Sequence, residues 1–201
     1  MGLWTSGKKG GLGGGSRAAW FKGEGEVLVK LTSAVTSTNR KKNDQTILTM
    51  QVLARAPDSD PHLGEEYAYR FCLGEARYPE SDSAEFARFV AGFHGVRIDA
   101  QENTLTDLGL DPETYDLESE RGRTLADLDI DERFEGLVDE MTSGEGDVWA
   151  DKVCSLRLIT PKGYTKLYAS AIPSGMHDAG TLTDKGLAIL QNQDWEVVTP
   201  F

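Results

Sequence analysis

The order of strand-like and helical stretches is the feature of this chain that most constrains its fold. Five stretches are rich in β-branched and aromatic residues, which is typical of strands. They cover residues 24–36, 45–55, 65–73, 152–159 and 164–172. Residues 81–94 instead carry aromatic and aliphatic side chains at helical spacing before Gly95, which predicts a short amphipathic helix. Because most strand pairs have no helix between them, parallel βαβ units are not expected.

The turns between these stretches predict two hairpins. The first has a basic tip at Arg40, Lys41 and Lys42, and the second is closed by the tight turn at residues 160–163. The predicted class is mainly β with α, in the form of a five-stranded OB-like barrel. Five strands with a helix between the third and the fourth is the order of the OB-fold, a small partly open barrel that binds oligonucleotides.

Composition divides the chain into three parts. Residues 1–19 include a glycine-rich run with two lysines and predict a flexible basic arm. Residues 20–172 form the OB-like domain, which carries an acidic insertion at about 99–147 with a helical pattern over 124–141. Residues 173–201 are expected to be a C-terminal tail.

Charge is distributed unevenly between these parts. The net charge is −12, yet residues 1–55 hold nine Lys and Arg against three acids, and residues 99–147 hold seventeen acids against three arginines. A chain this acidic should not adhere to nucleic acid through its bulk charge. A polyanion would have to bind through the basic N-terminal third, where the acidic segment could compete with it.

Residues suited to catalysis or metal binding are few. The three histidines, His62, His94 and His177, are not near a Cys or Ser in a known nucleophile motif. No His or Cys has the spacing of a metal site. We therefore predict a protein that is not an enzyme and has no metal and no cofactor. Because acid pairs are plentiful, a carboxylate-based enzyme is retained as the last of three hypotheses.

The cysteines and the hydropathy pattern predict a cytoplasmic protein. Cys72 and Cys154 lie in apolar strand-like stretches, as reduced core cysteines do, with a disulfide between neighbouring strands as the alternative. No apolar run approaches the roughly 20 residues that span a bilayer, and no apolar segment follows the N-terminal lysines. We expect neither a membrane segment nor a secretory signal.

Candidate nucleic-acid contacts are cations close to aromatic residues on the predicted strands, because bases stack on aromatic rings and cations follow the phosphates. The candidates are Trp20, Lys22, Lys30, Arg40, Lys41, Lys42, Arg70, Lys162, Tyr164, Lys166 and Tyr168. Lys166 shares one side of its strand with Tyr164 and Tyr168, which suggests a stacking ladder on an open face. The alternative for the aromatic residues is that they fill the core, and this is favoured for Tyr67, Tyr69 and Phe71. The alternative for residues 40–42 is a solvated loop without a ligand.

Four short motifs resemble, in their order, the single-stranded DNA-binding proteins of tailed phages. They are Gly25-Glu26-Val27-Leu28-Val29-Lys30-Leu31, Gly64-Glu65-Glu66-Tyr67, Phe86-Ala87-Arg88-Phe89-Val90 and Gly163-Tyr164-Thr165-Lys166-Leu167. The likeness covers roughly residues 20–95 and 150–172. It implies an OB-fold that binds single-stranded DNA in replication or recombination, as a homo-oligomer in the cytoplasm of the phage host.

The last residues add a second resemblance. Replication-type single-strand binders often end in an acidic tail with a terminal Pro-Phe that docks on partner enzymes. This chain ends in Pro200-Phe201 after Trp195, so the resemblance implies that these three residues dock replication or recombination proteins. Only two acids precede the tip, and an ordered strand that closes the fold is the alternative.

Three hypotheses follow. The first is a single-stranded DNA-binding protein. The second is a virion structural protein, such as a decoration or connector subunit, because a glycine-rich arm and an extended C-terminus suit subunits that lace into their neighbours. The third is the carboxylate-based enzyme.

Overall fold

The computed structural model describes residues 18–38, 44–73, 79–143 and 152–198. Its elements are β1 (Ala19–Trp20), β2 (Gly25–Thr38), β3 (Asp44–Arg55), β4 (Glu66–Leu73), α1 (Pro79–His94), α2 (Gln101–Asp107), η1 (Pro112–Thr114), α3 (Glu120–Ser143), β5 (Val153–Ile159), η3 (Pro161–Gly163), β6 (Lys166–Ala171), β7 (His177–Asp178), β8 (Thr181–Leu182), α4 (Asp184–Gln191) and β9 (Glu196–Val197). The five predicted strands and the predicted helix between the third and the fourth are all present.

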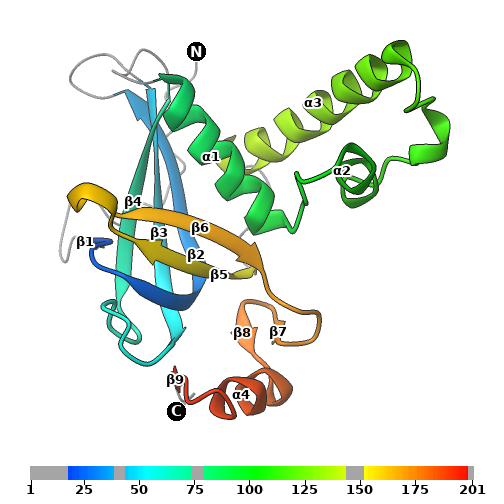
Figure 1. Ribbon diagram of the computed structural model, residues 1–201. Coiled ribbons are helices and arrows are strands. Elements are labelled where there is room, and N and C mark those ends of the chain that lie inside the picture. The colour runs from blue at the N-terminus through cyan, green and yellow to red at the C-terminus, as the bar shows by residue number, and fades with distance from the viewer. Residues whose placement is uncertain (1–17, 39–43, 74–78, 144–151, 199–201) are drawn as a thin grey trace.

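One sheet organises the molecule (Figure 1). Its strand order is β1-β4-β3-β2-β5-β6, with β9 added to β3, and all its pairs are antiparallel except that of β1 with β4. Two register shifts interrupt the pairing of β2 with β3, as bulges do: the extra residue is Leu53 of β3 at the first and Thr32 of β2 at the second. The sheet curls, so β5 and β6 cross in front of the other strands. A mainly β fold with helices is therefore present.

The curled sheet does not close into a barrel. Among the described residues no strand pairing joins β4 to β6, and α1 packs against both strands instead. Phe71 of β4 lies 5.0 Å and 5.3 Å, between ring centroids, from Phe86 and Phe89 of α1. On the other side, α1 approaches β6 so closely that a Cβ atom at Gly92 would lie 1.9 Å from the carbonyl oxygen of Ala169. The helix thus covers the opening between the two edges of the sheet.

The main core lies between the inner face of the sheet and α1. Most of its buried residues come from β2, β3, β4, β5 and α1, and include Val29, Leu48, Met50, Phe89 and Leu156. Tyr67 and Phe71 are buried there too, as the sequence favoured. Both cysteines are free, so the reduced alternative holds, and burial raises the pKa of the Cys154 thiol to about 12.

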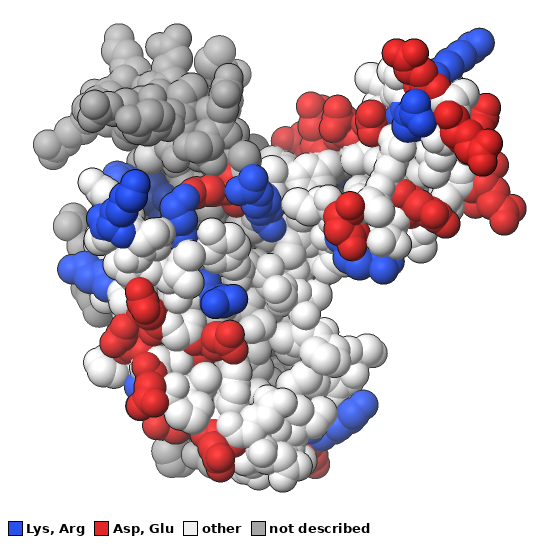
Figure 2. Space-filling model, in the orientation of Figure 1, with Lys and Arg blue, Asp and Glu red and all other residues white. Residues whose placement is uncertain are grey.

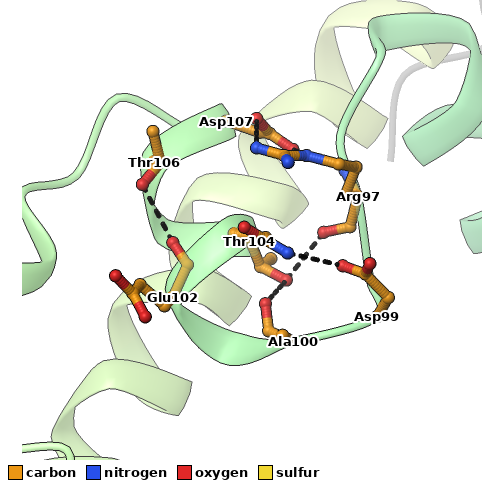
Figure 3. A network of polar contacts seen from close by, with 8 residues as sticks. Arg97, Asp99, Ala100, Glu102, Thr104, Thr106 and Asp107 are labelled. Carbon is orange, nitrogen blue, oxygen red and sulfur yellow. Dashed lines mark hydrogen bonds and ion pairs between the residues drawn. The ribbon is translucent and has the colours of Figure 1, made fainter.

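The acidic insertion forms an arm, α2 to α3, that points away from the sheet (Figure 1). The C-terminal half of α3 is anchored in the main core through Met141, which is buried. The base of the arm is fixed by polar contacts (Figure 3): Arg97 donates to Asp107 with its backbone N (2.8 Å) and its guanidinium (2.8 and 2.9 Å). These bonds hold the pKa of Asp107 low, at about 2. Thr104 Oγ1 donates to the Arg97 carbonyl at 2.7 Å.

The predicted C-terminal tail is folded as far as residue 198. Thr183 caps α4 by accepting from the backbone N of Gly186, and β9 pairs with β3. We call residues 173–198 the C-terminal lobe. A second core cluster joins this lobe to the sheet, and its buried members are Leu28, Ala54, Val153, Met176 and Leu190. The alternative of an ordered C-terminal strand is therefore present in the fold. In the described ranges no helix is both long and apolar enough to cross a membrane.

A half-buried histidine, His94, lies where α1 meets the start of β5. Lys152 Nζ lies 3.0 Å from Nδ1 of His94, and the Nε2 atom is buried without a hydrogen-bond partner among the described residues. Burial, with the charge of Lys152, lowers the pKa of His94 to about 4. Burial also lowers the pKa of Lys152, which the nearby Glu140 opposes. The folded state therefore favours neutral His94.

This histidine predicts a loss of stability in mild acid. Between pH 6.5 and pH 4 the unfolded chain binds a proton at residue 94 that the folded chain rejects, so the free energy of unfolding falls as the pH falls. Because the side chain is only partly buried, we expect a loss of about 1 kcal/mol between pH 7 and pH 5. Urea titrations at both pH values measure it. His94→Gln should remove most of that difference, and an equal loss in this variant would contradict the assignment.

Candidate nucleic-acid interface

Two segments that are far apart in sequence lie side by side at one end of the sheet. The hydroxyl of Thr160, before η3, donates to the carbonyl of Gly23 at 2.8 Å, and its backbone N donates to the Glu24 carboxylate at 3.2 Å. Gly23 has a φ of +86°, and a Cβ atom there would lie 2.1 Å from the Asp60 carboxylate that accepts from Glu24 N. This turn therefore requires glycine. The two bonds from Thr160 hold the residues that follow β1 next to the η3 turn.

Six of the predicted residues lie on these segments and on the adjoining β6. We call them the η3 surface: Trp20, Lys22, Lys162, Tyr164, Lys166 and Tyr168. The three aromatic side chains are 46%, 76% and 44% exposed, in sequence order. None of the three belongs to the main core, which agrees with the predicted open face for Tyr164 and Tyr168. Large aromatic rings left this exposed beside lysines are available to a ligand.

The geometry of the η3 turn explains why Tyr164 is exposed. Pro161 begins the turn, and Lys162 and Gly163 have φ values of +54° and +81°. Residues 161–164 of this tight reversal are all exposed. The chain then returns along β6, where the carbonyl of Thr165 accepts from the Tyr69 hydroxyl at 3.0 Å. The hairpin tip is thereby tied to β4.

Lys166 and Tyr168 share one side of β6, as the two-residue period predicts. They line a shallow depression together with Leu167 and with Glu85 and Arg88 of α1. Lys166 donates to the Glu85 carboxylate, which raises the pKa of the lysine.

Two exposed arginines that the sequence analysis did not assign extend this surface. Arg88 lies in the depression, and Arg157 of β5 is directly opposite Tyr168 in the sheet. Figure 2 shows Lys and Arg gathered over η3, the start of β6 and α1, whereas Asp and Glu dominate the arm. Residues 97–143 hold fifteen acids and four arginines, so the net charge of the arm is −11, while that of the whole chain is −12.

The other predicted residues lie elsewhere. Arg70 is exposed on the outer face of β4, opposite Ile47. Lys30 is opposite Val153, at the end of β5 remote from η3. Its ammonium lies against Gly180, where a Cβ atom would be 2.6 Å from Lys30 Nζ, so Lys30 points to the C-terminal lobe and not to the η3 surface.

The predicted partner-docking residues are only partly visible. Trp195 is half-buried and packs against the second core cluster. Pro200 and Phe201 lie outside the described residues, as do Arg40, Lys41 and Lys42. The described ranges contain no group of three or more His, Cys, Asp or Glu that could hold a metal ion.

Neither a protein-family model nor a curated protein matches the chain.

Proposed function

We propose that this protein binds single-stranded DNA through the η3 surface, in replication or recombination. The observation that supports this best is the alternation of Tyr164, Lys166 and Tyr168 along one exposed edge of the sheet. Base stacking on an aromatic side chain contributes about 1–3 kcal/mol per base and accepts any base, since every base has a π face. Lysines between the rings neutralise phosphates and release counterions.

The strand order supports the same proposal. We interpret β2, β3, β4, α1, β5 and β6 as the elements of an OB-like fold whose β4–β6 opening is covered by α1. OB-folds bind oligonucleotides on the face of their second and third strands and on the loops after the first and the fourth strands. Here these parts are β3 with β4, the segment between β2 and β3, and η3, and it is η3 that belongs to the η3 surface.

A salt series with a labelled oligo-dT of about 20 nucleotides tests the proposal. We expect binding at about 20 mM salt and a plot of log affinity against log salt that falls with a slope of about −2 or steeper. That slope corresponds to phosphates neutralised by Lys22, Lys162 and Lys166, at about 0.7 each for a single strand. Fluorescence anisotropy measures it. Absence of binding at the lowest salt would contradict the proposal, because the mechanism requires a salt-sensitive complex.

The arm favours a second candidate, a virion structural subunit. Leu125 and Leu128, three residues apart on α3, are 49% and 59% exposed, an arrangement that suits a contact between proteins. Sedimentation velocity separates the two candidates. A DNA-binding module should sediment as a small defined oligomer, whereas a virion subunit should form large assemblies that Leu125→Ser with Leu128→Ser would dissolve.

A further inference from the structure

The depression between α1 and β6 joins charges that the sequence keeps far apart. Glu85 and Arg88 are three residues apart on α1 and therefore share a face of the helix. Lys166 and Tyr168 reach the same depression from β6, and the buried side chain of Leu167 lies between them. The close approach at Gly92 holds helix and strand together, so the depression is a fixed part of the fold.

One carboxylate, that of Glu85, and two cations, Arg88 and Lys166, line this depression. Lys166 donates to Glu85, and the charge of Arg88 acts on the same ammonium, since it lowers the pKa of Lys166 while Glu85 raises it. The Glu85 side chain is 25% exposed and that of Lys166 is 40% exposed. An ion pair open to water to this extent is weak, so another anion can replace the carboxylate.

We propose that the depression is a phosphate subsite, in which Arg88 and Lys166 hold a backbone phosphate next to the ring of Tyr168. In the free protein the Glu85 carboxylate occupies the position of the phosphate and lowers the affinity of the η3 surface. This inference depends on the proposed function, and it adds to it a contact residue, Arg88, and a competing anion, Glu85.

The test compares Glu85→Gln and Arg88→Gln with the wild type in the oligo-dT salt series. Glu85→Gln releases Lys166 from its competitor, so we expect affinity to rise about fivefold at low salt. Arg88→Gln should weaken binding and should make the slope less negative by about 0.7, since one phosphate contact is lost. Arg88→Lys should restore most of that slope, because a point charge also neutralises a phosphate.

Glu135→Gln is the matched control. It makes the same change in net charge on the exposed side of α3, away from the depression, and should leave affinity within about twofold of the wild type. Equal affinities of Glu85→Gln and Glu135→Gln would overturn the subsite. An unchanged slope in Arg88→Gln would overturn it as well, while binding by the wild type would leave the proposed function intact. Absence of binding by the wild type and by every variant would overturn both.

Discussion

Gly92→Ala is expected to destabilise the protein by about 3 kcal/mol or more, although glycine to alanine normally stabilises a helix interior by up to about 1 kcal/mol. The reason is the added methyl group, which would lie 1.9 Å from the backbone oxygen of Ala169. Neither α1 nor β6 can absorb this overlap by rotating a side chain, so the helix must separate from the strand. For a chain of this length, a loss of 3 kcal/mol lowers the melting temperature by about 6–12 °C.

Gly136→Ala is the matched control for this prediction. Gly136 lies within α3, and an added Cβ atom would have no heavy atom within 4 Å. The same substitution should therefore raise the melting temperature by a few degrees. Thermal unfolding followed by circular dichroism measures both variants. A Gly92→Ala variant as stable as Gly136→Ala would show that α1 does not lie on β6 as described.

Removing the exposed tyrosines is expected to have the largest effect on DNA binding. Tyr164→Ala and Tyr168→Ala should each weaken oligo-dT binding by about 5-fold to 150-fold, which corresponds to the loss of about 1–3 kcal/mol of stacking. Tyr164 is 76% exposed, so its removal should leave the melting temperature almost unchanged. Anisotropy titrations at constant low salt measure the change.

Two further variants show whether the rings themselves matter. Tyr164→Phe keeps the π face and should keep most of the affinity. Leu128→Ala removes an exposed apolar side chain from the arm and should bind as the wild type does. The stacking account would be wrong if Tyr164→Ala bound as tightly as Leu128→Ala, or if Tyr164→Phe lost as much affinity as Tyr164→Ala.

The elements predicted from the sequence are those with a clear period. Phe86, Phe89 and Phe93 recur every three or four residues and define α1, and Tyr67, Tyr69 and Phe71 alternate along β4. α2 has no such period. Its seven residues bury only Thr104 and Leu105, and the bonds between Arg97 and Asp107 that fix it come from tertiary structure.

The C-terminal lobe was predicted only in part, through the alternative of an ordered strand, for a similar reason. Strands β7, β8 and β9 have two residues each, too few for an alternation to appear. They exist because the lobe buries Met176 and Leu190 against the outer side of the sheet, and that packing depends on contacts between distant segments. A tail was therefore predicted where the chain is folded.

The exposed side of β6 was predicted because local alternation determines it. Tyr164, Lys166 and Tyr168 follow one another at every second residue, and this pattern identified an open strand face. Arg157 and Arg88 were not assigned, because their place beside Tyr168 follows from the pairing of β5 with β6 and from the packing of α1 on β6. Lys30 was predicted to lie with these residues, because the local sequence does not show that its ammonium lies against Gly180 in the C-terminal lobe.

Nuclear magnetic resonance mapping on isotope-labelled full-length protein tests the central claim most directly. Oligo-dT is added stepwise while the backbone amide signals are followed. Binding through the η3 surface predicts progressive, saturable shifts of Tyr164, Lys166 and Tyr168, with the signals of α4 unchanged. Signals of β6 that stay constant while those of α3 or α4 move, or a spectrum unaffected by the oligonucleotide, would contradict it.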